Sequence, residues 1–206
     1  MNAKEFWNKR ADAYDASVKT RYADAYQCTI EITKKYLNQE QRVLAFACGT
    51  GIVANEIAAD VQHITGIDIS DQMIAHAGKK ASDQHISNIT YHVTALEDEV
   101  VQAGHFDVIT AFNVLYFLPD LKKKLRLIHA MLPEGGYFLS VTDCLGHVNP
   151  VRKLVTRLLI GLHRIPYMHL FTPEQLISEI KNAGFTIITT ENLFHEPPNV
   201  YIVAQK

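Results

Sequence analysis

Between residues 42 and 142, short apolar runs alternate with stretches of helical character, and this alternation restricts the fold more than any other feature. Helices are predicted to begin near residues 52, 71 and 119. The apolar runs between them occupy residues 43–47, 63–68, 88–93, 106–112 and 136–142. Strands that are apolar on both faces and separated by helices indicate a parallel sheet covered by helices on both sides.

The signals for helix starts agree with this pattern. Ser70 or Asp71 can cap the helix near residue 71, and Pro119 suits the first turn of a helix that runs to residue 131. Thr172 is a predicted N-cap, with Pro173 at the first helical position.

The two ends of the chain have patterns of their own. Residues 1–40 are predicted to be helical, because Tyr22, Tyr26, Ile30, Thr33 and Leu37 follow one another at three- and four-residue steps. Near the other end, Gly184 should stop the helix that starts at residue 173. Residues 185–193 and 199–206 are predicted strands, and their connection is too short for a helix, so they must be antiparallel.

Composition sets outer limits on the class of protein. The chain has 206 residues, with 20 Lys and Arg against 22 Asp and Glu, which gives a formal net charge of −2. A hydrophobic fraction of 48% is ample for the core of one domain. A nearly neutral chain lacks the positive excess of nucleic-acid-binding proteins, so we expect no nucleic-acid partner.

Cysteine usage and the N-terminal sequence indicate a cytoplasmic protein. Cys28, Cys48 and Cys144 are too widely spaced for a disulfide framework or a zinc site, and a reducing compartment suits them. The ten histidines lack paired metal-ligand spacing, so we expect no metal. The first residues are charged, and no apolar run approaches the roughly 20 residues of a membrane span, so we expect no stable membrane insertion.

The segment from Val43 to Gly51 carries the most chemical information. It is a predicted strand that ends in Gly49-Thr50-Gly51 and leads into a helix, so backbone N–H groups can approach a ligand closely. Asp68 follows at the end of the second strand, where a carboxylate can accept both hydroxyls of a ribose. Together they predict a cofactor that contains adenosine. Two alternatives remain: a tight turn with a capping Asp, and a nicotinamide or flavin site, because Gly49-x-Gly51-x-x-Ala54 also fits that pattern.

Several segments together resemble the class I S-adenosylmethionine-dependent methyltransferases, in the branch that acts on small molecules. They are FWNKRADAYD, VLAFACGTG, GIDIS followed by Met73, FDVITAFNVLYFL, LPEGG and FTPEQLISEIKNAGF. The resemblance covers nearly the whole chain. It implies a Rossmann-like, doubly wound α/β fold whose seven-stranded sheet is mostly parallel with an antiparallel last strand. It also implies S-adenosylmethionine as cofactor and S-adenosylhomocysteine as product.

The resemblance assigns roles to individual positions around the cofactor. Ala47, Gly49 and Gly51 would line the methionine part, and Asp68 would hold the ribose. The remaining contacts would come from Tyr14 and Asn113 at the methionine end, Ile69 and Met73 beside the adenine, and Leu96 and Glu97 at the adenine edge. Plain core packing is the alternative for Met73 and Leu96.

The chain departs from the family pattern at three positions. The family's first strand commonly reads V-L-D-x-G-C-G-T-G, whereas this chain has Ala45 for the acidic residue and Ala47 for the first glycine. Loss of the acidic group should weaken binding of the cofactor's ammonium end by about 1 to 3 kcal/mol. Ala47 adds a methyl group near the turn, and Ala95 replaces an Asp near the adenine contact. An inactive module that only binds the cofactor is therefore an alternative to an enzyme.

Residues after strands four and five are candidates for contact with the methyl acceptor, because pockets of open α/β sheets lie beyond the carboxyl ends of the strands. Tyr116 and His147 are the predicted catalytic side chains, His147 because its ordinary pKa suits a base near neutrality. Asp143 and Cys144 are predicted acceptor contacts.

Residues 143–172 form an insertion with a predicted amphipathic helix that begins near Pro150. Its polar side carries Arg152, Lys153 and Arg157, with Arg164 beyond, and no acidic residue lies between positions 143 and 174. One hypothesis is a lid whose Arg152 and Arg157 attract an anionic acceptor. The alternatives are an apolar stripe docked on the core beneath a solvated basic face, and a helix at a membrane surface.

We therefore predict one methyltransferase domain over residues 1–206 that methylates a small, possibly anionic molecule as a monomer or homodimer. A nicotinamide-dependent reductase is a less favoured alternative. The predicted parts are a helical cap (1–40), a cofactor-binding core (42–142), a helical lid (143–172) and a C-terminal helix with a hairpin (173–206).

Overall fold

The computed structural model of the protein describes residues 2–147, 149–162 and 164–206, and the side chains of residues 147, 150 and 152 also lie outside the description. Its strands are β1 Arg42–Phe46, β2 His63–Asp68, β3 Ile89–Val93, β4 Val108–Phe112, β5 Tyr137–Asp143, β6 Thr186–His195 and β7 Pro198–Gln205. Its α-helices are α1 Ala3–Asn8, α2 Ala11–Arg21, α3 Ala23–Lys34, α4 Ile52–Glu56, α5 Asp71–Asp83, α6 Glu99–Gln102, α7 Leu121–Met131, α8 Pro150–Gly161 and α9 Pro173–Asn182. Short 3-10 turns cover 58–60, 115–117 and 145–147.

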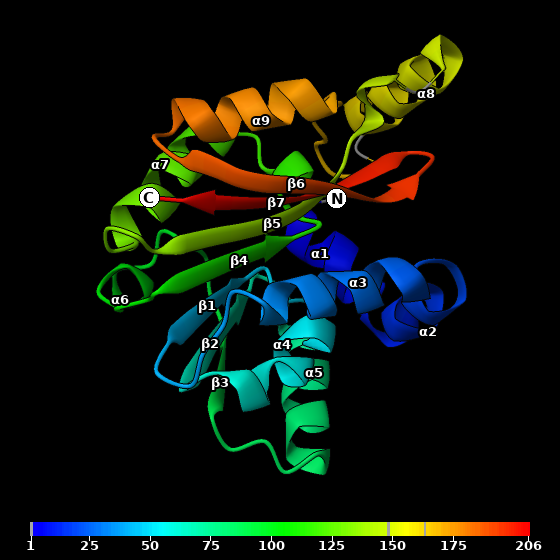
Figure 1. Ribbon diagram of the computed structural model, residues 1–206. Helices are drawn as coiled ribbons and strands as arrows, with labels where there is room; N and C mark the ends of the chain where they lie inside the picture. Colours follow the sequence, from blue (N-terminus) through cyan, green and yellow to red (C-terminus); the bar gives the residue numbers. More distant parts are fainter. Residues whose placement is uncertain (1, 148, 163) are drawn as a thin grey trace.

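The strands form one seven-stranded sheet in the order β3-β2-β1-β4-β5-β7-β6 (Figure 1). Neighbouring strands are parallel except where β7 lies antiparallel between β5 and β6. The predicted Rossmann-like fold, with its antiparallel last strand, is thus confirmed. The order reverses direction between β1 and β4, and such a switch point opens a crevice at the carboxyl ends of the strands.

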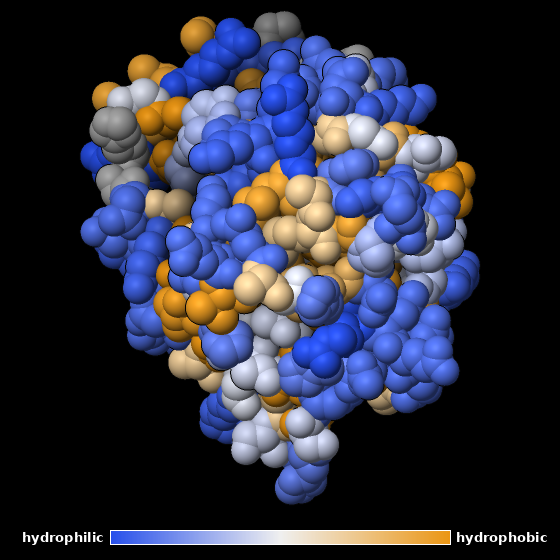
Figure 2. Space-filling view, turned by 90° about the vertical axis from the view of Figure 1, so that its left-hand side faces the viewer, coloured by the Kyte–Doolittle hydropathy of each residue, from blue (hydrophilic) through white to orange (hydrophobic). Residues whose placement is uncertain are grey.

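Both faces of the sheet are buried, as the continuous apolar runs predict. On β1, Leu44 and Phe46 belong to one core cluster, while Val43 and Ala45 belong to the other. The first cluster includes apolar residues of α7 and α9, and the second includes residues of α3 and α4. Figure 1 shows these helices on opposite sides of the sheet. Figure 2 shows the side of the molecule on which α7 and the C-terminus lie. Hydrophilic residues cover most of this side, because the apolar stripe of α7 faces inward.

Most predicted helix ends are confirmed. Ser70 accepts the Met73 N–H at the start of α5, Thr172 forms a capping box with Gln175, and Gly184 has a φ of +109° just beyond α9. Pro119 was placed wrongly, because α7 begins at Leu121 with Asp120 at the N-cap position. The proline lies outside the helix and lines a cavity described below.

The apolar stripe of α8 does not dock on the core. The residues Val151, Leu154, Val155, Leu158 and Leu162 are between 48% and 68% exposed, and the helix projects from the body of the molecule (Figure 1). The prediction of a docked stripe was therefore wrong. The spacing of apolar residues establishes that a helix is amphipathic, but it does not say whether the body of the protein offers a surface to cover that stripe.

Two residues without glycine's freedom adopt left-handed backbone conformations at the switch point. Ala47 follows β1 with a φ of +52°, and Asn113 follows β4 with a φ of +56°. Asn tolerates this region because its short polar side chain can bond locally, whereas Ala does not gain such a bond. The replacement of the family's glycine by Ala47 therefore acts mainly by straining the backbone. The sequence pattern alone did not reveal this strain.

We expect Ala47→Gly to raise the free energy of unfolding by about 0.5 to 1 kcal/mol. Removing the left-handed alanine relieves about 1 to 2 kcal/mol, and part of this gain is offset by the more flexible unfolded chain. The matched control is Ala75→Gly on the exposed side of α5, which should lower stability by about 0.5 to 1 kcal/mol. Urea unfolding measures both, and a loss of stability in Ala47→Gly would contradict the assignment of strain.

Candidate functional site

A cavity of about 260 Å³ lies at the carboxyl ends of β1, β2 and β4, and we call it the Asp68 cavity. It occupies the switch point of the sheet, where open α/β folds bind their ligands. Its described lining comprises Ala3, Trp7 and Tyr14 from the N-terminal helices, Phe46, Ala47, Gly49, Asp68, Ile69 and Met73, Ala95 and Leu96, and Phe112, Asn113, Val114, Phe117, Leu118, Pro119, Asp120 and Lys124.

Asp68 is the buried acidic group of this cavity. Its carboxylate accepts hydrogen bonds from the backbone N–H of Gly49 at 3.0 Å and of Ser70 at 2.8 Å. Burial raises the pKa of Asp68, while the N–H groups of Ser70 and Gly49 oppose the rise. Each carboxylate oxygen keeps acceptor capacity for a further donor. The arrangement can therefore receive a vicinal diol while remaining fixed to the glycine turn.

The glycine turn combines an open position with a crowded one. A Cβ added to Gly49, which has a φ of +55°, would meet nothing within 4 Å, so this position faces open space. A Cβ added to Gly51 would lie 2.6 Å from Oη of Tyr91. Gly49 lines two of the cavities described in this section, and Gly51 lines none of the three. Gly51 therefore packs against Tyr91 beneath the turn, and its predicted contact with the ligand stays a prediction.

The predicted adenine contacts divide into two groups. Met73 and Leu96 are almost fully buried and also line the Asp68 cavity, so core packing and cavity lining coincide there. Ile69 is 39% exposed at the cavity edge. Glu97 pairs with Lys124, and of these two it is Lys124 that lines the cavity. The predicted contact of Glu97 with the adenine edge stays a prediction.

A second cavity, of about 170 Å³, adjoins the first, and we call it the Asp143 cavity. Trp7, Tyr14 and Asn113 line both cavities and form a common wall. The other described lining residues are Ser17, Val18, Tyr22, Ala25, Tyr26, Thr29, Tyr116, Asp143 and Asn199. The predicted acceptor residue Asp143 thus faces a chamber built largely by the N-terminal helices.

Hydrogen bonds run through the wall between the two cavities. Oη of Tyr14 lies 2.8 Å from Oη of Tyr26, and the side chain of Tyr26 also bonds that of Asn113. Nδ2 of Asn199 donates to Oδ1 of Asn113 at 3.1 Å and to Oδ1 of Asp143 at 2.7 Å. We refer to these five side chains as the wall network. They join two residues of the helical cap to the ends of three strands.

Burial sets the protonation of the wall network. It raises the pKa of Tyr14 well above its usual value and raises that of Tyr26, so both phenols stay protonated. Burial also raises the pKa of Asp143, which the hydrogen bond from Asn199 and the charge of Arg21 partly oppose. Asp143 is the titratable carboxyl group within this described lining.

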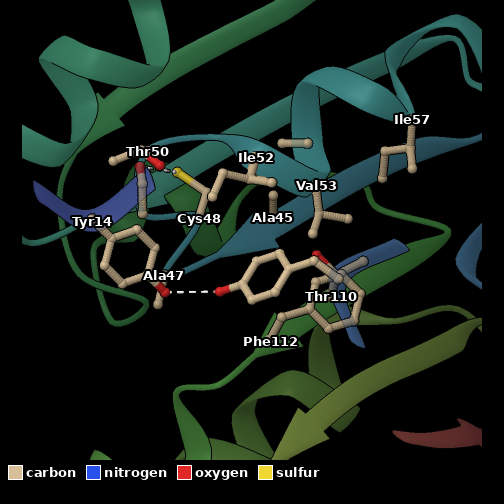
Figure 3. Close-up of a pocket in the computed structure, with 13 residues that line it drawn as sticks. Tyr14, Ala45, Ala47, Cys48, Thr50, Ile52, Val53, Ile57, Thr110 and Phe112 are labelled. Carbon is tan, nitrogen blue, oxygen red and sulfur yellow. Dashed lines mark hydrogen bonds between the residues drawn. The ribbon is translucent and has the colours of Figure 1, made fainter. Parts of the chain in front are cut away.

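A third, small cavity of about 50 Å³ lies beneath the glycine turn, and we call it the loop cavity. Ala45 and Ala47 line it together with Cys48, Thr110 and Phe112 (Figure 3). The Tyr14 ring closes one side, and the dashed line in the figure marks its hydrogen bond to Tyr26. Tyr14, Tyr26, Thr50 and Thr110 also line this cavity beside Ala45.

The predicted catalytic and acceptor residues have different outcomes. Tyr116 lines the Asp143 cavity, but burial raises its pKa well above the usual value, which disfavours a role as base. Cys144 is fully buried in the core, where its thiol donates to the carbonyl of Thr142, so the predicted acceptor contact is not supported. Arg157 is exposed on α8 and lines neither the Asp68 cavity nor the Asp143 cavity. The side chains of His147 and Arg152 lie outside the described residues.

Sequence reasoning missed residues that build the site. Tyr26 belonged to the predicted apolar stripe of the cap, and nothing in its spacing revealed that its hydroxyl faces a cavity. Asn199 was expected only as the start of a strand, yet the pairing of β5 with β7 sets it opposite Asp143. Asp15 accepts from Oγ1 of Thr50 and Nζ of Lys80, and so ties α2 to the glycine turn and to α5.

Comparison with known proteins identifies the family of this chain. Residues 14–190 match the family model described as "Methyltransferase domain". A ubiquinone biosynthesis O-methyltransferase from Acinetobacter baumannii strain AYE is 26% identical over 76% of this chain and 68% of its own. The N-methyltransferase NodS from Bradyrhizobium japonicum, solved with S-adenosylhomocysteine, superposes with a TM-score of 0.76 at 16% identity over 100% and 99% of the two chains. The DhpI complex with S-adenosylhomocysteine gives 0.73 at 16% identity over 98% and 93%.

The part of the chain that the structure describes has neither a metal-binding cluster nor a membrane-spanning helix. Among the described residues, no cluster of three or more His, Cys, Asp or Glu side chains could hold a metal ion. None of the described helices has the length and apolar character needed to cross a bilayer. The Gly49 turn, the buried Asp68 at the switch point and the match over residues 14–190 agree: the chain belongs to the methyltransferase-domain family and is an S-adenosylmethionine-dependent methyltransferase.

Proposed function

We propose that this protein transfers a methyl group from S-adenosylmethionine to a small molecule, with the cofactor in the Asp68 cavity and the acceptor in the Asp143 cavity. One observation carries the proposal: the two cavities share Trp7, Tyr14 and Asn113 as a common wall. Ligands in two cavities that share these lining residues would be neighbours, and the acceptor atom must reach the methyl carbon directly beside these side chains. Alignment of two bound reactants is a main source of rate enhancement.

The residues that line the Asp68 cavity suit the cofactor chemically. Asp68 would accept the ribose hydroxyls, Gly49 would leave room for the backbone to approach the ligand, and Met73 with Leu96 would pack on the adenine. When bound, S-adenosylmethionine supplies a methyl group already activated by a positively charged sulfur. The remaining tasks of the chain are to hold both ligands in line and to exclude water.

The sequence raised the hypothesis of an anionic acceptor, but the residues that line the two cavities do not support it. The described cations of the insertion, Lys153, Arg157 and Arg164, line neither the Asp68 nor the Asp143 cavity. The residue that brings charge to the Asp143 cavity is the acidic Asp143 itself. We therefore propose a small-molecule acceptor without a requirement for negative charge, and we leave the lid as a hypothesis.

The setting of the reaction is also a proposal. Free cysteines at positions 28, 48 and 144 favour the cytoplasm as the compartment. We propose a monomer or a homodimer, because the Asp68 and Asp143 cavities are each lined by residues of one chain. Turnover is tested by incubating the protein with methyl-labelled S-adenosylmethionine and a panel of phenols, alcohols and amines. Release of S-adenosylhomocysteine that depends on the acceptor supports the proposal, and its absence across the panel opposes it.

We expect Asp68→Asn to weaken the binding of S-adenosylhomocysteine by about 10- to 100-fold, because a charge-assisted hydrogen bond contributes about 1.5 to 3 kcal/mol. 5′-Methylthioadenosine keeps the ribose but lacks the amino-acid end, so its affinity should fall by a similar factor. Calorimetry measures both. The control is Asp83→Asn at the exposed end of α5, which should change neither affinity.

We expect Ala45→Asp to strengthen the binding of S-adenosylhomocysteine by about 5- to 100-fold, which corresponds to about 1 to 3 kcal/mol from a restored charge-assisted contact with the ammonium group. 5′-Methylthioadenosine, which has no ammonium group, should gain nothing. Ala45→Asn supplies a side chain of the same shape without charge. Equal gains in the Asp and Asn variants would contradict the role assigned to the charge.

A further inference from the structure

Polar groups that line the Asp143 cavity can still accept hydrogen bonds from a ligand. Nδ2 of Asn199 donates to both Asn113 and Asp143, which fixes its amide with the nitrogen between two oxygens. Among the described residues, Asn199 is the donor to the Asp143 carboxylate, and this carboxylate has about four lone-pair positions. A ligand that donates N–H or O–H hydrogen bonds would satisfy the remaining positions, whereas a ligand carboxylate or phosphate would not.

The charges around the cavity favour the same kind of ligand. Tyr14, Tyr26 and Tyr116 stay neutral because burial raises the pKa of each phenol. The charge of Arg21 reaches Asp143, but Arg21 is exposed and does not line the cavity. The described lining thus presents one carboxyl group and contains no Lys or Arg. An anion bound there would meet the like charge of Asp143, and the described lining offers no Lys or Arg to pair with it.

The rest of the lining suits an organic body. Trp7, Tyr14, Tyr22, Tyr26 and Tyr116 surround the space with aromatic side chains. Aromatic faces pack against flat apolar groups and attract ammonium groups. Val18 and Ala25, both buried, add apolar surface from α2 and α3. The cavity therefore combines an aromatic enclosure with one anchoring carboxyl group at the end of β5.

We propose that the Asp143 cavity selects a methyl acceptor that is an uncharged or cationic alcohol, phenol or amine, anchored by an N–H or O–H group on the Asp143 carboxylate. This inference rests on the proposed function and narrows it to a substrate class. Asp143 determines specificity through this hydrogen bond, and the wall network holds the carboxylate in place. Asn199 is a positioning residue, because it acts on the acceptor through Asp143.

The test uses three probes of similar shape and different charge: benzyl alcohol, benzylamine and benzoate. They are titrated into the full-length protein saturated with S-adenosylhomocysteine. The fluorescence of Trp7 reports binding, because this single tryptophan lines both the Asp68 cavity and the Asp143 cavity. We expect benzyl alcohol and benzylamine to bind at least tenfold more tightly than benzoate. Benzoate binding as tightly as either of the others would overturn the inference.

Variants locate the effect at Asp143. Asp143→Asn should weaken benzylamine about tenfold and reduce the discrimination against benzoate, while S-adenosylhomocysteine binding stays unchanged. Asp24→Asn, on the exposed side of α3, is the matched control and should alter none of these constants. Ala25→Leu keeps Asp143 but fills the cavity, so it should weaken benzyl alcohol and benzylamine together without affecting S-adenosylhomocysteine. Unchanged probe affinities in both Asp143→Asn and Ala25→Leu would overturn the inference.

Different results would contradict the proposed function and the proposed acceptor class. A wild-type protein that binds no S-adenosylhomocysteine would contradict the proposed function, whatever the benzyl probes do. A protein that binds S-adenosylhomocysteine but prefers benzoate, or ignores Asp143→Asn and Ala25→Leu, would contradict only the proposed acceptor class.

Discussion

The wall network is the interaction on which the organisation of the site depends. It joins Tyr14 and Tyr26 of the helical cap to Asn113, Asn199 and Asp143 at the strand ends. Buried hydrogen-bonded networks define one geometry, because an unpaired polar group in a low-dielectric interior is costly. The N-terminal helices are thereby held at the carboxyl edge of the sheet, where they divide one crevice into two adjoining cavities.

The switch point of the sheet explains why unusual backbone conformations gather there. Ala47 and Asn113 end the two strands from which the order runs in opposite directions, and both have positive φ values. Such conformations cluster at functional sites, where the surrounding structure holds them in place. The side chain of Asn113 lines both cavities. Ala47 has the same unfavourable positive φ but no polar side chain.

The lining of the Asp68 cavity could be predicted in large part from sequence because its determinants are local. The strand that leads to Gly49 and the acidic end of β2 lie within short segments with their own periodicity, so Asp68 and the glycine turn could be recognised directly. The Asp143 cavity depends on contacts between distant segments. Asn199 meets Asp143 only because β7 inserts between β5 and β6, and the orientation of Tyr26 depends on how α3 packs on the sheet. Pro119 was misplaced for a simpler reason, since a proline two residues before a helix resembles one at its start.

The projecting helix α8 has a consequence for local stability. Asn149 caps its first turn and Pro150 begins it, but its apolar stripe gains little from packing on the body of the protein. Helices of about 12 residues are marginal in water when they lack tertiary support. The backbone amides of α8 should therefore exchange with solvent deuterium through local opening, while those of β1 and β4 exchange only when the core itself opens. Although α8 has 12 residues, it should therefore unfold locally without the rest of the protein unfolding.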